Sequence, residues 1–308
     1  MKVLVTGGAG FIGSHVVDRL LEEDHQVAVV DDLSTGKERN LNPDATFYKL
    51  DICDFIALEE VFRLERPQIV NHHAAHVDVR RSVKEPSFDA RVNILGSLNL
   101  LELSRRHGVE KFIYISTGGA VYGEPRYLPV DESHPIQPIS PYGVSKHAGE
   151  LYLIAYREAF GMRSTILRYP NVYGPRQDPH GEAGVVAIFS ELMLVGERPT
   201  IFGDGGKTRD YVYVDDIVRA NLLVMDRSGD GEIYNLGWGK EVTDFEIFRA
   251  VRDAVGAKVE PIYGEKRPGE VERICLDSTK ARQELGWEPT VPLEEGIPRA
   301  VEYYRRNT

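Results

Sequence analysis

A run of glycines near the N-terminus constrains the fold more than any other stretch of the chain. The segment KVLVTGGAGFIG begins as a short apolar strand and turns at once into closely spaced glycines. An amphipathic pattern follows, which predicts a helix whose apolar face is Phe11, Ile12, Val16, Val17, Leu20 and Leu21. Glycines let the backbone turn tightly, and the free N–H groups at the start of a helix attract phosphate. The sequence therefore predicts a phosphate-binding turn at the start of an α/β fold.

The spacing of these glycines and the acids that follow them indicate a dinucleotide site. Gly7, Gly10 and Gly13 form GxxGxxG, one residue different from the GxGxxG of the commonest dinucleotide-binding fold. A second apolar stretch ends at Asp31 and Asp32. An acid about 20 residues beyond the glycines suits the ribose 2′-hydroxyl of NAD and repels the 2′-phosphate of NADP. We therefore expect NAD as the cofactor.

The order of predicted elements gives the fold class. Strand and helix patterns alternate through the first half, which predicts a Rossmann-type, doubly wound parallel sheet with helices on both faces. Beyond residue 171 the elements are shorter, and residues 232–236 resemble one more strand of the first sheet. We expect a cofactor domain over residues 1–171, completed by about 209–237, and a smaller α/β substrate domain within residues 172–308.

Hydroxyl groups and a tyrosine–lysine pair follow the strand predicted at residues 111–115. Ser116 and Thr117 come at its end, while Tyr142 and Lys146 stand one helical turn apart in a predicted helix. Ligands of open α/β sheets bind at the carboxyl ends of strands. A tyrosine hydroxyl has an ordinary pKa near 10, and a nearby ammonium favours its phenolate. Such pairs are also common on exposed helix surfaces, but the dinucleotide turn upstream favours a general base here.

Composition argues against several other classes of protein. The net charge of −11 disfavours a nucleic-acid surface, and no apolar run approaches the roughly 18 residues that span a bilayer. Cys53 and Cys275 are the only cysteines, which favours a reducing cytoplasm, and the N-terminal strand predicts no signal peptide. His72, His73 and His76 have no Cys, Asp or Glu nearby at ligand spacing, so we expect no metal.

A series of motifs in this order resembles one family over essentially the whole chain. The motifs are GGAGFIG, the Asp31-Asp32 pair, YISTGGAVYGEP, SPYGVSK, LRYPNVYGPRQ, GDGGKTRDYVYVDD and RPGEVERICLDSTKARQELGW. They resemble the extended short-chain dehydrogenase/reductase family, and within it the 4-epimerases of UDP-glucose and UDP-galactose.

The resemblance implies an NAD-dependent isomerase that interconverts UDP-glucose and UDP-galactose through a 4-keto sugar. In the family, the tyrosine that matches Tyr142 takes the proton of the sugar 4-hydroxyl while NAD accepts the hydride. The lysine that matches Lys146 binds the nicotinamide ribose and lowers the pKa of the tyrosine. The sugar then turns and takes the hydride back on its other face. The resemblance also implies a homodimer through the helices near residues 86–107 and 142–160.

The resemblance and the motifs together assign binding residues. For NAD these are Gly7, Gly10, Phe11, Ile12, Gly13, Asp31, Asp32, Asp51, Ile52, Ala74, Asn93, Ser116, Tyr142 and Lys146. For the UDP-sugar they are Asn171, Arg209 and Arg267 near the diphosphate and Phe202 at the uridine. Ile274 matches a position where a bulky tyrosine blocks N-acetyl sugars, so we expect UDP-glucose and UDP-galactose as the main substrates.

Gly118 departs from the family pattern, which usually has Ser or Thr there. Two replacements for the missing hydroxyl are open: a water in the vacant space, or Thr117, turned inward by the conformational freedom of Gly118 and Gly119. We favour Thr117 as a catalytic hydroxyl, although it could instead bond only to backbone. Gly184-Val185 also replaces an Asn-Leu pair that many epimerases carry.

Three other functions compete with this interpretation. Related 4,6-dehydratases and decarboxylases need an acid before VYG, where this chain has Gly119 and Ala120. A non-catalytic sensor of NAD or sugar nucleotide is the second, and the retention of Tyr142 and Lys146 argues against it. The third is epimerisation of a UDP-N-acetyl sugar or a UDP-uronate.

Overall fold

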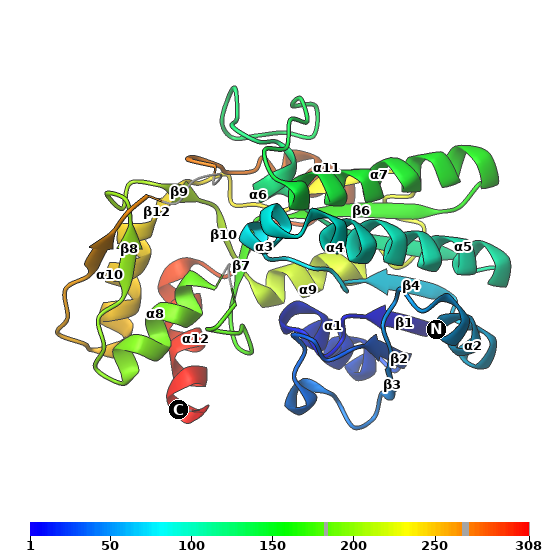
Figure 1. Ribbon diagram of the computed structural model, residues 1–308, viewed down its shortest axis with the longest axis horizontal. Coiled ribbons are helices and arrows are strands. Elements are labelled where there is room, and N and C mark those ends of the chain that lie inside the picture. The colour runs from blue at the N-terminus through cyan, green and yellow to red at the C-terminus, as the bar shows by residue number, and fades with distance from the viewer. Residues whose placement is uncertain (182–183, 267–270, 308) are drawn as a thin grey trace.

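The computed structural model describes residues 1–181, 184–266 and 271–307. Within them the main sheet consists of β1 (Lys2–Thr6), β2 (Gln26–Asp31), β3 (Thr46–Lys49), β4 (Ile69–His72), β5 (Lys111–Thr117), β6 (Ser164–Tyr169) and β11 (Ile233–Asn235). All seven strands are parallel, in the order β11-β6-β5-β4-β1-β2-β3 (Figure 1). The predicted Rossmann-type sheet is confirmed, and the late strand β11 pairs with β6 as expected.

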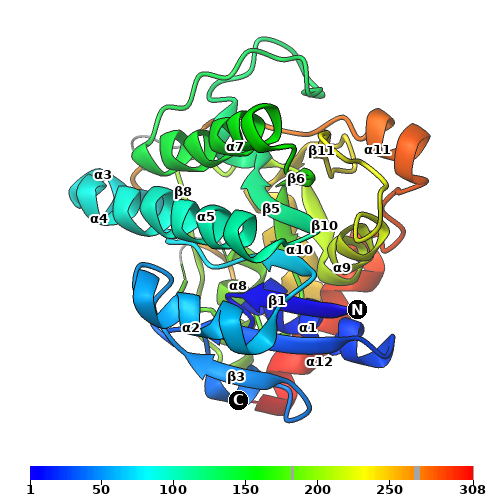
Figure 2. The same ribbon diagram turned by 90° about the vertical axis from the view of Figure 1, so that its right-hand side faces the viewer.

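Helices cover both faces of this sheet (Figure 2). On one face lie α2 (Phe55–Glu65), α5 (Ser97–His107) and α7 (Pro141–Phe160), and on the other lie α1 (Phe11–Glu22) and α9 (Val214–Leu223). Strand β1 shows why its sequence is apolar throughout. Leu4 packs into the core under α2 and α5, while Val3 and Val5 pack into the core under α1. Alternate side chains of a strand point to opposite faces, so a strand covered on both sides needs apolar residues throughout.

The helix predicted from Pro86 to about His107 is interrupted. It consists of α4 (Pro86–Ala90), a π-helical segment η2 (Arg91–Gly96) and α5. The hydroxyl of Ser97 donates to the carbonyl oxygen of Asn93 at 2.7 Å. Side-chain bonds of this kind compete with the backbone ladder of a helix. Short π segments are often found at functional sites, and this one carries the candidate residue Asn93.

The second lobe is built from short strand pairs and three longer helices. The strand pairs are β7 (Asn171–Tyr173) with β10 (Tyr211–Tyr213), β8 (Thr200–Phe202) with β13 (Ile262–Gly264), and β9 (Thr208–Arg209) with β12 (Val242–Thr243). The helices α8 (Val185–Leu194), α10 (Asp244–Val255) and α12 (Leu293–Asn307) pack together beside them (Figure 1). The remaining elements are η1 (Glu38–Asn40), α3 (Val79–Lys84), α6 (Gly118–Val121) and α11 (Thr279–Leu285).

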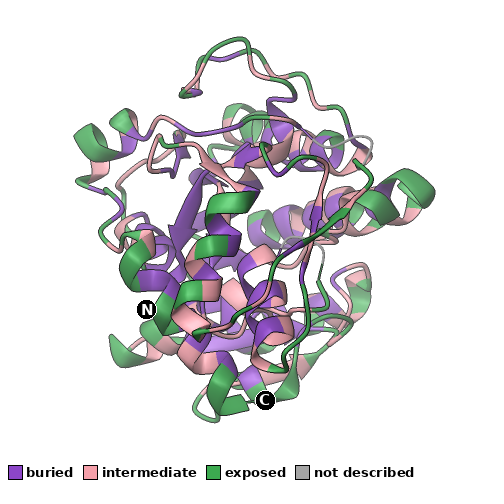
Figure 3. Ribbon diagram, turned by 90° about the vertical axis from the view of Figure 1, so that its left-hand side faces the viewer, coloured by how far each residue is buried: buried purple, intermediate pink, exposed green. Residues whose placement is uncertain are grey.

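One hydrophobic core joins the two lobes. It begins between the sheet and helices α1 and α9 and continues into the inner faces of α8, α10 and α12. Figure 3, viewed from the side of the second lobe, shows buried residues along the strands and green, exposed residues on the outer helix surfaces. None of the helices in the described ranges is both long and apolar enough to cross a membrane.

Candidate active site

The sheet reverses its strand order at β1, and the predicted glycine turn lies there. Strands β2 and β3 extend from β1 to one side and β4 lies on the other, which makes β1 and β4 a topological switch point. Gly7 has a φ of +71°, and a Cβ atom there would lie 2.6 Å from the backbone nitrogen of Ala74. Only glycine combines this backbone conformation with so close an approach. The turn therefore lies where ligands of such sheets bind.

The start of α1 has the features of a phosphate site. A Cβ at Gly13 would lie 2.2 Å from the carbonyl oxygen of Gly7, so the turn and the helix are in direct contact. Gly10 precedes the helix and provides no side-chain cap. The first N–H groups of a helix have no intrahelical partner, and an anion can satisfy them. Phe11 and Ile12, both predicted to bind NAD, stand at these positions.

Asp31 and Asp32 differ sharply in their surroundings. The carboxylate of Asp31 is 7% exposed and accepts hydrogen bonds from the backbone of Ala9 at 3.0 Å and Leu33 at 2.9 Å. Burial raises the pKa of Asp31. Each carboxylate oxygen can accept a second bond, which suits a ribose diol. Asp32 is exposed and binds the backbone and hydroxyl of Ser34. The glycine cradle, the uncapped helix and Asp31 together fit NAD.

Four other predicted cofactor residues lie on neighbouring elements. Asp51 and Ile52 follow β3, where the Asp51 carboxylate accepts from the backbone of Cys53 at 2.9 Å and Ile52 is buried. The Ser116 hydroxyl is buried and donates to Glu150 at 2.5 Å. Asn93 is 1% exposed, and its side chain bonds to His76, Asp89 and Ser145. The side chains of Ser116 and Asn93 are therefore engaged by protein partners.

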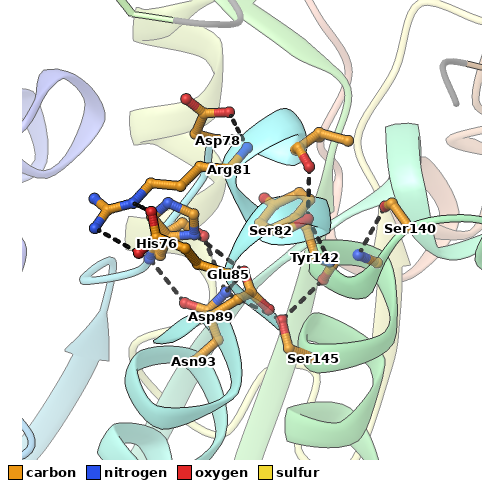
Figure 4. Close-up of polar contacts among 12 residues, drawn as sticks. His76, Asp78, Arg81, Ser82, Glu85, Asp89, Asn93, Ser140, Tyr142 and Ser145 are labelled. Carbon is orange, nitrogen blue, oxygen red and sulfur yellow. Dashed lines mark hydrogen bonds and ion pairs between the residues drawn. The ribbon is translucent and has the colours of Figure 1, made fainter. Parts of the chain in front are cut away.

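Tyr142 and Lys146 lie in the first turns of α7, as predicted. The helix begins at Pro141, and the hydroxyl of Ser140 accepts from the backbone of Gly143 at 3.2 Å. Ser82 of α3 accepts from the backbone nitrogen of Tyr142 at 3.2 Å (Figure 4). Lys146 is only 4% exposed, and its ammonium lies 4.4 Å from the centre of the Tyr114 ring. Burial lowers the pKa of Lys146 to about 8, although two nearby carboxylates oppose the shift.

Thr117 ends β5 beside Asn171. A Cβ placed on Gly119 would lie 3.7 Å from the Thr117 hydroxyl oxygen and 3.9 Å from the Asn171 side-chain oxygen. These two candidate residues thus flank one point at the carboxyl edge of the sheet. Within the described ranges the Thr117 hydroxyl makes no hydrogen bond, and it does not cap α6. The interpretation of Thr117 as a backbone-bonded residue therefore has no support in the structure.

The structure gives a packing reason for Gly118, whereas the replacement of its hydroxyl by Thr117 stays a prediction. A Cβ at Gly118 would lie 2.3 Å from a methyl carbon of Leu276, which is fully buried. Leu276 therefore fills the space in which we expected a water molecule. Neither Gly118 nor Gly119 has a positive φ, so the strand end does not rely on the conformational freedom of glycine. The close packing of Leu276 against the backbone explains the glycine at position 118.

The sequence analysis missed a buried charge network behind the candidate catalytic residues. Glu150 of α7 accepts from Arg168 of β6 through Nε at 2.8 Å and Nη2 at 2.6 Å. The same carboxylate accepts from Ser116 and bonds to His147. Burial alone would raise the pKa of Glu150, but the Arg168 guanidinium and the other donors hold it at about 2. An arginine in a strand of the buried central sheet was the signal for such a partner.

The predicted substrate residues lie on different elements of the chain. Phe202 ends β8, and Arg209 of β9 donates to the carbonyl oxygens of Thr208 at 2.7 Å and Glu272 at 3.4 Å. Ile274 is 2% exposed in an apolar cluster with Leu276. Arg267 lies outside the described residues.

Two of the three histidines near the end of β4 bond to protein groups. His72 bonds to Thr6 and Ser97, and His76 bonds to Asp89. In the part of the chain that the structure describes, no three His, Cys, Asp or Glu side chains are arranged to hold an ion.

Comparison with known proteins supports the resemblance over the whole chain. Residues 3–237 match the model of the NAD dependent epimerase/dehydratase family. A UDP-glucose 4-epimerase of Mycolicibacterium smegmatis is 47% identical, with 100% of both chains covered. The crystal structure of UDP-glucose 4-epimerase from Thermotoga maritima with UDP-glucose is 54% identical, has a TM-score of 0.98 and covers 100% of this chain and 99% of that one. The UDP-glucose 4-epimerase of Thermus thermophilus in complex with NAD is 46% identical with a TM-score of 0.95, and both chains are fully covered. These matches show that the chain belongs to the NAD-dependent epimerase/dehydratase family.

Proposed function

We propose that the protein interconverts UDP-glucose and UDP-galactose by inverting the sugar at C4, a reaction of galactose metabolism. The observation that carries this proposal is the position of Tyr142 and buried Lys146 at the edge of a sheet whose switch point holds the glycine turn. The relatives of similar length support the same activity.

Different residues of this chain have different roles in the proposed reaction. NAD, when bound, supplies the acceptor for the C4 hydrogen and returns it. Tyr142 takes the proton of the sugar 4-hydroxyl and gives it back, because an adjacent ammonium favours its phenolate. Lys146 provides that ammonium and binds the nicotinamide ribose. Thr117 donates a hydrogen bond to the 4-oxygen, a role for which its unpaired hydroxyl is available.

The two lobes hold the two ligands in this proposal. Residues 1–171 and 209–237 bind NAD through the glycine turn and Asp31. The rest of residues 172–308 binds the UDP-sugar, with Phe202 at the uridine. Asn171 and Arg209, at the borders of the NAD-binding ranges, lie near the diphosphate. The sugar preference set by Ile274 stays a prediction, since its side chain is closed off from solvent.

Conversion of UDP-galactose to UDP-glucose by the purified protein tests the proposal. A panel that includes N-acetylated and uronic UDP-sugars ranks the substrates. We expect fast conversion of the two hexoses with NAD neither added nor consumed. Binding of NAD and UDP-sugar without turnover would instead support a non-catalytic sensor. Preferred turnover of a UDP-N-acetyl sugar would show that this sugar, and not UDP-galactose, is the main substrate.

The acid at the end of β2 should control cofactor choice. We expect Asp31→Ala to lower NAD affinity about 10- to 100-fold, the ratio that corresponds to the loss of a hydrogen bond to a charged group. The affinity for NADP should fall much less, because the same change removes a charge that repels the 2′-phosphate. Calorimetric titration of both cofactors measures the ratio. Asp32→Ala is the comparison. An equal loss of NAD affinity in Asp32→Ala would contradict the assignment of the ribose contact to Asp31.

The Thr117 hydroxyl should contribute to turnover. We expect Thr117→Ala to lower kcat at least about tenfold, because a donor to the developing charge at the sugar oxygen is removed. Steady-state kinetics with UDP-galactose measure the loss, with Thr46→Ala, an exposed strand residue, as control. Full activity in Thr117→Ala would leave Tyr142 acting without a partner hydroxyl.

The outward surfaces of η2 and α7 support assembly as a homodimer. Leu95, Val144, Leu151 and Phe160 are each more than half exposed there. Exposed apolar patches on paired helices are typical of interfaces. Sedimentation at micromolar concentration tests the dimer, and a monomer would contradict it. The free cysteines, Cys53 and Cys275, support a reducing, cytoplasmic location.

A further inference from the structure

A buried acid outside the predicted set lies next to α7. Asp89 of α4 is 1% exposed. Its Oδ1 atom accepts from the Asn93 amide and lies 3.1 Å from Nδ1 of His76. Its Oδ2 atom is buried and has no partner among the described residues, and the same holds for Nε2 of His76. An unpaired carboxylate oxygen in the interior is costly, so its position calls for a physical reason.

Hydrogen bonds connect this acid to the helix that carries the catalytic pair. The Asn93 amide nitrogen contacts both Asp89 and the hydroxyl of Ser145, each at 3.1 Å. Ser145 is the residue before Lys146, and α4 packs directly against α7. Figure 4 shows His76, Asp89, Asn93 and Ser145 as one connected group beside Tyr142. The side chain of Asp89 is therefore held next to the start of α7.

Two carboxylates favour the ammonium form of Lys146: Glu150, which has the larger effect, and Asp89. The titratable side chains there are Tyr142 and Glu150 on α7, Tyr114 on β5, His72 and His73 at the end of β4, and Asp89 on α4. Burial keeps the pKa of both histidines low, so they are neutral. Glu150 is already paired with the Arg168 guanidinium at 2.6 Å. Within the described residues, the ion-pair partner of Asp89 is a histidine and not a permanent cation.

We infer that Asp89 is a positioning residue that keeps Lys146 protonated, with His76 and Asn93 orienting its carboxylate. This inference rests on the proposed function, because a protonated Lys146 is what favours the Tyr142 phenolate. In this role Asp89 acts through Lys146. It offsets the burial that otherwise drives the ammonium toward its neutral form.

The pH dependence of the holoenzyme tests this role. Asp89→Asn keeps the shape of the side chain and removes its charge. We expect the basic limb of the kcat profile to move to lower pH by about one unit, the smallest change typical of losing a neighbouring opposite charge. The Lys146 side chain should titrate at a correspondingly lower pH. Its titration is followed by ¹³C NMR of lysine-labelled holoenzyme, and Lys146→Arg identifies its signal.

Two further variants separate charge from structure. Glu85→Gln removes an exposed carboxylate nearby, one paired with Arg81, and should leave profile and titration unchanged. His76→Gln keeps Asp89 charged, so it should lower kcat without moving the basic limb. An Asp89→Asn enzyme that is slower at every pH with an unmoved limb and Lys146 signal overturns the inference. If Tyr142→Phe is inactive in the same experiments, the proposed function stands and only the role of Asp89 is refuted. If Tyr142→Phe is active, the proposed function itself is refuted.

Discussion

Replacing Tyr142 with phenylalanine is expected to lower kcat for UDP-galactose by at least about 100-fold, because the change removes the general base. The ring stays in place at the start of α7, where Pro141 and the Ser140 cap define the helix end. The backbone bond from Tyr142 to Ser82 does not involve the phenol and is kept. NAD content and KM should therefore change much less than kcat. Steady-state kinetics together with the NAD occupancy of the purified variant measure both effects.

Tyr152→Phe is the matched control for this experiment. Tyr152 lies on the same helix, 40% exposed on its outer side, and loses the same hydroxyl group. It should retain the activity of the unaltered protein. A Tyr142→Phe enzyme that turns over as fast as Tyr152→Phe would take Tyr142 out of the mechanism.

The parts of this site that follow from local patterns could be predicted. The glycine turn needs only a strand, a tight bend and a helix start, and these occupy one continuous stretch around Gly7 and Gly13. Tyr142 and Lys146 share a helix face because they are four residues apart. The alternation of strands and helices likewise predicted the sheet, since each element carries its own periodicity.

The parts that depend on packing between distant segments could not be predicted. Gly118 is explained by Leu276, and nothing near position 118 in the chain indicates which side chain will cover it. The π segment at Asn93 interrupts an otherwise helical pattern that gives no sign of it in the sequence. Asp89 resembles an exposed helix residue in the sequence, and only the arrangement of α4 against α7 buries it.

The buried pair of Arg168 and Glu150 should dominate the stability of this region. We expect Arg168→Met to lower the free energy of unfolding by about 3–5 kcal/mol, since removing one partner leaves an uncompensated charge in the interior. Glu150 is fully buried and Arg168 is 3% exposed, so water cannot replace the lost guanidinium. Urea unfolding of the holoenzyme measures the loss. The double variant Arg168→Met, Glu150→Met should recover part of it, because no charge is then left unpaired.

An exposed pair of similar geometry is the control for Arg168→Met. Arg63 and Glu60 on α2 are also joined by two hydrogen bonds, but their side chains are 63% and 52% exposed. Water and salt screen such a pair, so Arg63→Met should leave the unfolding free energy nearly unchanged. A loss as large as that of Arg168→Met would show that the deficit does not come from burial of the charge.

The pH dependence of unfolding identifies the charge that causes the deficit. In the unaltered protein Glu150 has a pKa held at about 2, below its unfolded value, so its contribution is present at neutral pH and is lost as the pH falls through about 2. In Arg168→Met, burial raises the pKa of the same carboxyl above its unfolded value. The penalty is then greatest at neutral pH and shrinks as acid protonates Glu150 in the folded state. The loss of unfolding free energy in Arg168→Met, relative to the unaltered protein, should therefore become smaller from pH 7 toward pH 5. A deficit that stays constant over this range would assign it to lost packing of the arginine stem, because packing does not titrate.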